Sequence, residues 1–153
     1  MSQAEKLSSS LEDYLETIYA IVRKKGAARP TDIARERNVA ASSVTTALKN
    51  LKKLGLVNHE PYDLVTLTPS GSRLAMKVTE KHNVLLDFFT GVLEIDPETA
   101  EKCACSMEHA IPQDVLERFT AYLEFVRKCD DSGRRYTDEE GFVCRCVNHR
   151  EGS

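Results

Sequence analysis

The sequence lacks the features that mark a membrane or secreted protein. No apolar run approaches the ~20 residues of a transmembrane helix, and the first six residues lack the apolar core of a signal peptide. Tryptophan is absent, and aromatic residues make up only 7 % of the 153 residues. The apolar fraction of 41 % and the charged fraction of 29 % are ordinary for a soluble globular protein. We therefore expect a cytoplasmic protein with no membrane partner, built from one domain or two small ones.

Acidic residues are missing from one stretch, residues 39–58, which carries three lysines. Residues 1–72 hold 10 Lys and Arg against 8 Asp and Glu, whereas residues 73–153 hold 11 against 16. The net charge of −3 argues against a nucleic-acid partner, but its uneven distribution argues for one. A basic patch on one half is expected of a protein that contacts DNA phosphates, although a solvated helix face explains three lysines about as well.

The N-terminal part has the pattern of a winged helix-turn-helix. Ser9 and Glu12 have the spacing of a capping box, and a first helix then runs to Gly26. Pro30 starts a short second helix, and after a turn a third helix is expected over residues 42–54. Two short strands joined by a turn, over residues 57–67, predict the wing. An ordinary helical hairpin is the less favoured reading of this pattern.

The outward face of the third helix is small, hydroxylic or basic. Such a surface suits a helix that lies in a major groove of double-stranded operator DNA with its N-terminal end at the base edges. The predicted DNA-contacting residues are Ser42, Ser43, Thr45, Thr46, Lys49 and Lys53. Ala40 or Ala41 stands where a capping side chain would stabilise this helix by roughly 1 kcal/mol.

Three more helices are expected after the wing. A long fourth helix runs from Pro69 to about Val92, and its wide apolar face indicates a second core or a dimer seam. A fifth helix is capped by Asp96 and is broken by Pro112, and a sixth covers residues 113–128. The fold class is therefore mainly α: a winged helix-turn-helix domain over residues 1–72, an all-helical domain over residues 73–128, and a cysteine-containing tail over residues 129–153.

Within the fifth helix, Cys105, Glu108 and His109 are spaced i, i+3 and i+4, so that all three project from one face. A thiol, a carboxylate and an imidazole there make half of a metal site. Asp13 and Glu16, at i and i+3 on the first helix, are either solvated acids or oxygen ligands that face another element. His82, at the edge of the apolar stripe of the fourth helix, taken alone is more typical of a boundary residue than of a ligand.

The ordered set of motifs resembles the metal-dependent repressors of the diphtheria-toxin-repressor and manganese-transport-regulator family. The motifs are the segment 10–19 of the first helix, Val44-Thr45 in the third, Lys81-His82 in the fourth, and Cys105-x-x-Glu108-His109-Ala110 beyond. Together they cover residues 8 to 128. The resemblance implies a homodimeric repressor that binds operator DNA when a divalent metal is bound. It also implies a helical domain that both binds metal and forms the dimer, and no role for a small-molecule substrate.

Carried over residue by residue, the resemblance gives the metal ligands as Asp13, Glu16, His82, Cys105, Glu108 and His109. As the family is usually described, manganese sensors have Asp at the position of Asp13 and a carboxylate at that of Cys105, while iron sensors have Met and Cys there. This chain combines Asp13 with Cys105. Because a thiolate favours later and softer metals, Fe(II) is the expected metal and Mn(II) is the alternative.

The C-terminal residues depart from the family pattern. Larger members append an SH3-like domain, for which this sequence is too short. The tail instead holds Cys129, Cys144, Cys146 and His149, which could form a small structural Zn(II) site, although one residue between two thiolates is an unusual spacing. A redox-active or disulfide pair and a disordered tail with incidental cysteines are the other interpretations. Without a secretory context, five cysteines favour metal or redox chemistry over a disulfide framework.

Two rival functions follow from the same residues. A winged-helix regulator could respond to redox state or another signal rather than to metal. A metal-dependent hydrolase built on Glu108 and His109 would need an open coordination position and a general base in a cleft. No such motif and no glycine-rich phosphate loop is present, so we expect that the protein is not an enzyme.

Overall fold

The structure is a computed structural model of the whole chain, and it describes residues 7–59, 64–128, 134–137, 139 and 141–144. The chain separates into two compact units, residues 1–80 and 81–153. Their boundary lies inside the long helix α4, Pro69–Gly91. The fold is mainly helical, as predicted. The division of the chain into regions 1–72, 73–128 and 129–153 remains a prediction.

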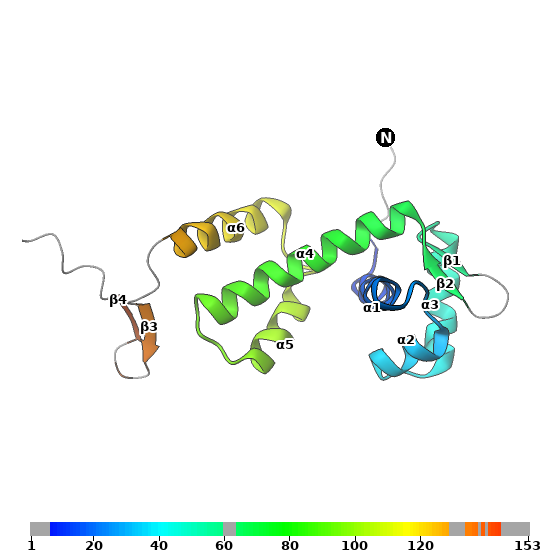
Figure 1. Ribbon diagram of the computed structural model, residues 1–153, viewed down its shortest axis with the longest axis horizontal. Coiled ribbons are helices and arrows are strands. Elements are labelled where there is room, and N and C mark those ends of the chain that lie inside the picture. Colours follow the sequence, from blue (N-terminus) through cyan, green and yellow to red (C-terminus); the bar gives the residue numbers. More distant parts are fainter. Residues whose placement is uncertain (1–6, 60–63, 129–133, 138, 140, 145–153) are drawn as a thin grey trace, which may run out of the picture. The chain divides into compact units, whose positions relative to one another are not determined.

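The first unit holds three helices and a two-stranded ribbon (Figure 1). These are α1, Ser9–Lys25; α2, Pro30–Arg37; α3, Ala41–Lys53; β1, Val57–His59; and β2, Val65–Leu67. The strands pair antiparallel with Val57 opposite Leu67, as expected for the wing. A bridge between Ala28 and Val65 ties the loop after α1 to β2.

The helix ends of this unit follow local backbone chemistry. Ser8, and not Ser9 as the capping-box spacing predicted, caps α1 by accepting a hydrogen bond from the Leu11 amide. Gly26 ends the helix at a φ of 83°, which glycine adopts without steric cost. Asn38 takes the left-handed conformation in the turn between α2 and α3. Ala40 caps α3 without a side-chain hydrogen bond, as the sequence predicted.

The core of the first unit lies where the three helices and the ribbon meet. Its fully enclosed residues come from every element and include Leu15, Ile18, Ile33, Leu48, Leu51 and Val65. Gly71, in the first turn of α4, completes this packing. A Cβ atom there would lie 1.9 Å from the Leu56 carbonyl oxygen, so only glycine fits. The wing and the start of α4 are therefore packed closely within one unit.

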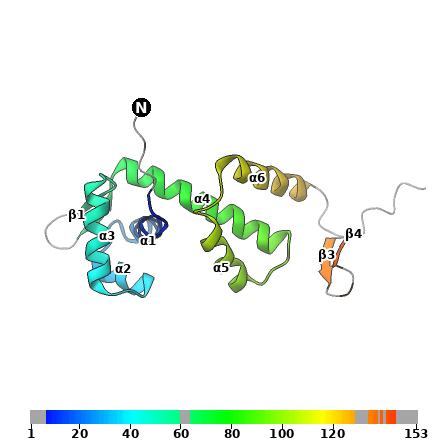
Figure 2. The same ribbon diagram turned by 180° about the vertical axis from the view of Figure 1, so that it is seen from behind.

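The second unit packs two helices on the second half of α4, and both Figure 1 and Figure 2 show them beside it. They are α5, Pro97–Met107, and α6, Gln113–Lys128. Leu85, Phe89, Ala100, Ala104 and Leu116 form the core. Ala100 and Ala104 of α5 are small and fully buried in this core.

The helix that carries the predicted half-site is shorter than expected. Asp96 caps α5 and Pro97 begins it, as predicted, but the helix ends at Met107 rather than at Pro112. Glu108 and His109 lie in the turn that follows. The amides of Ala110 and Ile111 both donate to the Met107 carbonyl, because a residue before proline is driven from helical geometry and the last turn tightens.

The tail contains a hairpin that the sequence did not predict. Strand β3, Arg134–Thr137, pairs antiparallel with β4, Gly141–Cys144. Cys144 ends β4, while Cys129, Cys146 and His149 lie outside the described residues. Within the residues that the structure describes, no helix combines the length and the apolar character of a membrane span.

Candidate metal centre and nucleic-acid interface

Glu108 is the centre of the candidate metal site. It is fully buried, and it is the one charged residue in the buried set of the described chain. The turn after α5 places it beside α4. Burial of a carboxylate is costly unless charged or hydrogen-bonding partners offset the lost hydration, so its neighbours define the site.

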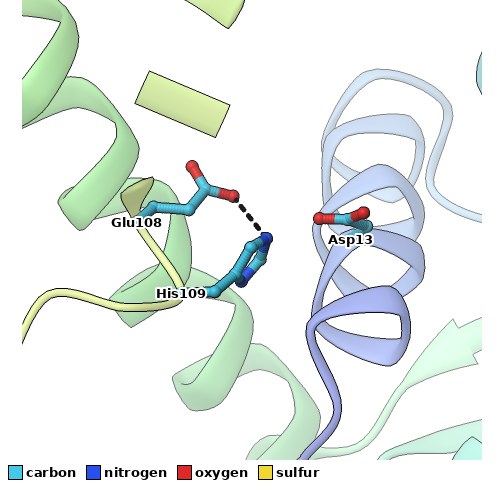
Figure 3. Close-up of side chains that lie close together, drawn as sticks. All are labelled: Asp13, Glu108 and His109. Atoms are coloured by element: carbon cyan, nitrogen blue, oxygen red, sulfur yellow. Dashed lines mark ion pairs between the residues drawn. The ribbon is translucent and has the colours of Figure 1, made fainter. Parts of the chain in front are cut away.

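Two imidazoles flank this carboxylate. His82 of α4 lies with Nδ1 2.7 Å from Glu108 Oε2, and Nε2 of His109 lies 3.2 Å from Oε1. Figure 3 shows the His109 ring turned toward the Glu108 carboxylate. The His109 contact is an ion-pair distance without hydrogen-bond geometry. Within the described part of the chain, the buried Oε1 atom therefore accepts no hydrogen bond.

His82 bridges two carboxylates. Its Nε2 atom lies 3.2 Å from the carboxylate of Glu101, whose side chain is 58 % exposed. The hydrogen bond to Glu108 is the main cause that raises the pKa of His82 to about 9, with Glu101 adding to it and burial opposing it. At neutral pH the ring is therefore an imidazolium, and its charge offsets that of the buried carboxylate.

The donor set of the second unit fits a divalent metal. A buried carboxylate oxygen without a hydrogen-bond donor among the described residues lies beside two histidine rings. A cation that displaces the proton of His82 would find there the oxygen and nitrogen ligands that Mn, Fe and Zn ions accept. The structure thus brings together three of the six predicted ligands, His82, Glu108 and His109. Cys105 lies on α5, three residues before Glu108, and is exposed.

The other two predicted ligands belong to α1 of the first unit. Asp13 and Glu16 lie one turn apart and are both partly exposed; Figure 3 shows the Asp13 side chain projecting from α1. Oδ2 of Asp13 accepts a hydrogen bond from Nη2 of Arg37 at 3.1 Å. The sequence analysis did not predict this pairing, because 24 residues separate Asp13 and Arg37 in the chain. Glu101, the second partner of His82, was also not predicted as part of the site.

The candidate DNA surface is the outer face of α3. All six predicted contact residues are exposed, while Val44, Ala47, Leu48 and Leu51 bury the opposite face. The hydroxyls of Thr45 and Thr46 donate to the carbonyls of Ala41 and Ser42 in their own helix. The ammonium of the neighbouring Lys52 donates a hydrogen bond to the carbonyl of His59, the last residue of β1.

The start of α1 and the first half of α3 border an open cleft in the first unit. Hydroxyl and amide side chains line it, namely those of Ser8, Ser10, Ser42, Ser43, Thr46 and Asn50, together with Leu11, Tyr14 and Ala47. These polar residues extend the exposed polar surface of α3 as far as the start of α1. The candidate DNA-binding surface therefore includes residues of both helices.

Comparison with known proteins finds two family models that match successive parts of the chain. Residues 6–65 match the iron dependent repressor N-terminal DNA binding domain, and residues 68–137 match the iron dependent repressor metal binding and dimerisation domain. The chain is 40 % identical over 121 residues to an uncharacterized HTH-type transcriptional regulator, MJ0568, of Methanocaldococcus jannaschii, covering 77 % of this chain and 95 % of that protein. It is 35 % identical over 114 residues to the transcriptional regulator MntR of Salmonella typhimurium strain LT2, covering 74 % and 72 %.

Solved structures show the same fold. T. acidophilum IdeR matches with a TM-score of 0.68 and 28 % identity over 81 % of this chain and 55 % of that one. A manganese-dependent transcriptional repressor in complex with manganese matches with a TM-score of 0.67 and 28 % identity, over 75 % and 53 %. The chain thus spans about half the length of these two solved proteins. It belongs to the iron-dependent repressor family, whose members are metal-dependent DNA-binding regulators and not enzymes.

Proposed function

We propose that this protein is a metal-activated transcriptional repressor that controls metal homeostasis by binding operator DNA as a homodimer. The observation that carries the proposal is Glu108, a buried carboxylate between His82 and His109 with one oxygen that accepts no hydrogen bond in the described chain. Such a carboxylate in a family of DNA-binding regulators is best explained as a ligand that a cation completes. We keep the cytoplasm as the proposed location.

The proposed ligand set joins residues of both units. His82, Glu108 and His109 supply two imidazoles and a carboxylate, and the family resemblance adds Cys105 from α5 and Asp13 and Glu16 from α1. A bound divalent cation would supply the positive charge that lets the carboxylates of Asp13, Glu16 and Glu108 share one site.

Fe(II) is the proposed metal, with Mn(II) as the alternative. The exposed thiol of Cys105 favours Fe(II), whereas the carboxylates accept the harder Mn(II) as well. The comparisons name both metals, since the matching family models are described as iron dependent repressors and one solved relative is a manganese-dependent repressor with manganese bound. A structural Zn(II) site in the tail remains a prediction from sequence alone.

DNA recognition would use α3, with Ser42, Ser43, Thr45 and Thr46 toward base edges and Lys49 and Lys53 toward phosphates. Two such helices read a palindromic operator only if the dimer holds them about 34 Å apart, one helical turn of DNA. The bound metal would act by preorganising this spacing. Since coupling between two ligands is reciprocal, operator DNA should then tighten metal binding.

The proposed dimer surface lies on α6 and the adjoining part of α4. Tyr122 and Phe125 of α6 are 48 % and 61 % exposed, and Val115 is 37 % exposed. Tyr122 lies between Phe125 and Phe88 of α4 in tilted contacts, with ring centroids 6.2 Å apart on each side. We propose a second copy of the chain as the partner of this apolar surface, because the family model that matches residues 68–137 is described as a metal binding and dimerisation domain.

Operator binding with and without metal tests the function. A DNA duplex enriched from a randomised library by the Mn(II)-loaded protein is titrated anaerobically with metal-free, Fe(II)-loaded and Mn(II)-loaded protein, and affinity is read by fluorescence anisotropy. We expect metal to tighten binding at least tenfold. Equal affinity in the three states would reject metal sensing and favour a regulator of the redox-responsive kind.

Two variants sharpen this test. Glu108→Gln keeps the shape of the buried side chain but removes its charge, so the metal response should disappear. Glu117→Gln removes an exposed charge from α6 and should leave the response unchanged.

A further inference from the structure

Arg37 holds a fixed position against a proposed metal ligand. It is the last residue of α2, and its Nη2 atom donates to Asp13 Oδ2 on α1 at 3.1 Å. The two side chains are only 24 % and 22 % exposed. The guanidinium also lies over the ring of Tyr14, with Cζ 4.7 Å from the ring centroid. A cation is thus held beside the Asp13 carboxylate by two independent contacts.

This pair differs from the ion pair that Arg35 forms on the same helix. Arg35, on the same turn of α2, pairs with Asp32 three residues away and is 75 % exposed, so that water screens it. Arg37 instead reaches a different helix and is largely removed from water. Its Nε atom is buried and has no hydrogen-bond partner among the described residues. The ion pair with Asp13 and the stacking on Tyr14 are therefore the contacts that offset the lost hydration of this guanidinium.

We propose that Arg37 is a built-in competitor of the metal at Asp13, and that it sets the metal concentration at which the protein responds. The inference rests on the proposed function, in which Asp13 is a ligand. An oxygen that accepts a guanidinium hydrogen bond gives up part of that interaction when it binds a cation. A fixed positive charge next to the ligand also repels a dication, and this repulsion is strong where water is scarce. Both effects weaken metal binding.

The test measures the affinity of the full-length protein for Mn(II) alone, by competition with a fluorescent chelator in the absence of DNA. Arg37→Gln and Arg37→Met remove the charge, and the methionine keeps an apolar stem over Tyr14. Each should lower the Mn(II) dissociation constant by roughly three- to tenfold, more than the loss of an exposed pair would produce. Arg37→Lys retains the positive charge and should stay within about twofold of the wild type.

Arg35→Gln is the matched control. It removes the same charge from the same helical turn but breaks a pair with Asp32, so the Mn(II) affinity should not change. Asp13→Asn should weaken Mn(II) binding, and adding Arg37→Gln to it should raise the affinity less than Arg37→Gln does alone, because only the charge repulsion then remains to be relieved.

The outcomes separate this inference from the proposed function. Unchanged Mn(II) affinity in Asp13→Asn would remove Asp13 from the ligand set, and the proposed function would need other ligands. Weakened binding in Asp13→Asn, with no gain in either neutral Arg37 variant, would overturn only the role given to Arg37. A loss of affinity in those variants would also overturn it, since Arg37 would then orient Asp13 for the metal. Thermal unfolding of each metal-free variant identifies any that fails to fold, and the second neutral variant then decides.

Discussion

At the scale of single residues, the chain places its most costly group where its function is proposed. Glu108 is fully buried, and its carboxylate lies beside His82 and His109, of which the protonated His82 offsets its charge. A leucine at this position would pack with less cost. We therefore infer that the buried carboxylate serves the function of the protein and does not stabilise its fold.

A residue with a simpler role is Asp96, which caps α5 by accepting a hydrogen bond from the Thr99 amide at 3.0 Å. This bond to the Thr99 backbone is the main cause that lowers the pKa of Asp96 below its ordinary value of 3.8. Because the folded state holds the ionised form, the stabilisation is present above pH 3.8 and is lost as the pH falls through the lowered pKa.

We therefore expect Asp96→Ala to lower the unfolding temperature at pH 7, and the difference from the wild type to shrink as the pH is lowered toward 3. Thermal unfolding followed by circular dichroism over this pH range measures it. Asp96→Asn keeps an oxygen that can accept the Thr99 bond but does not titrate, so it should lose less at pH 7. A deficit in Asp96→Ala that is the same at every pH would show that the charge of the cap has no part in stability.

At the scale of helices and strands, capping and helix-breaking residues predicted where most elements begin and end. The prediction failed where an element's end depends on contacts with residues far away in the sequence. Gly26, Pro30 and Pro97 act within one turn of chain, and the helices end or begin at them as predicted. The end of α5 at Met107 and the hairpin β3–β4 were not anticipated. An apolar pattern does not reveal how a last turn tightens before proline. Each strand of the hairpin has four residues, which is too few to show a clear alternation of apolar and polar residues.

The candidate site was predictable to a similar extent. The i, i+3, i+4 spacing drew attention to the segment of Glu108 and His109 from sequence alone, although its premise of one helix face was wrong for both, because α5 ends at Met107 and they lie in the turn after it. The contact of Arg37 with Asp13 could not be read in the same way, because it depends on how α2 packs against α1. Similarly, the second carboxylate at His82, that of Glu101, follows from the packing of α4 on α5.

The junction of β1 and α4 gives a sharp test at this scale. Gly71→Ala would place a methyl carbon 1.9 Å from the Leu56 carbonyl oxygen, and backbone atoms yield little. We expect a loss of about 2 kcal/mol or more in the free energy of unfolding, measured with urea. Gly91→Ala, at the other end of the same helix, meets no atom within 4 Å. That control should be neutral or slightly stabilising, and equal effects at the two positions would contradict the close packing at Gly71.

At the scale of the whole molecule, the proposed repressor depends on association of two chains. Phe125 is the most exposed large apolar residue of the described chain, at 61 %, and it adjoins Tyr122 on α6. Phe125→Glu would place a charge in the middle of the proposed apolar contact, where desolvation makes it costly.

We expect Phe125→Glu to convert dimers to monomers at micromolar concentration in analytical ultracentrifugation, with metal affinity of the monomer little changed. Glu117→Lys, an exposed substitution on the same helix, should leave the dimer intact. A wild-type chain that sediments as a monomer, or a Phe125→Glu dimer as stable as that of the wild type, would exclude this surface as the interface.

The position of the boundary between the two units has a practical consequence. Residues 80 and 81 lie in the middle of α4, so the chain passes from one unit to the next without leaving helical geometry. Proteases need an extended segment of several residues to bind and cleave, and this junction offers none. A fragment that is cut there would also lose half of the helix on which its own core is packed. Expression of either unit by itself therefore requires that it keep α4 whole.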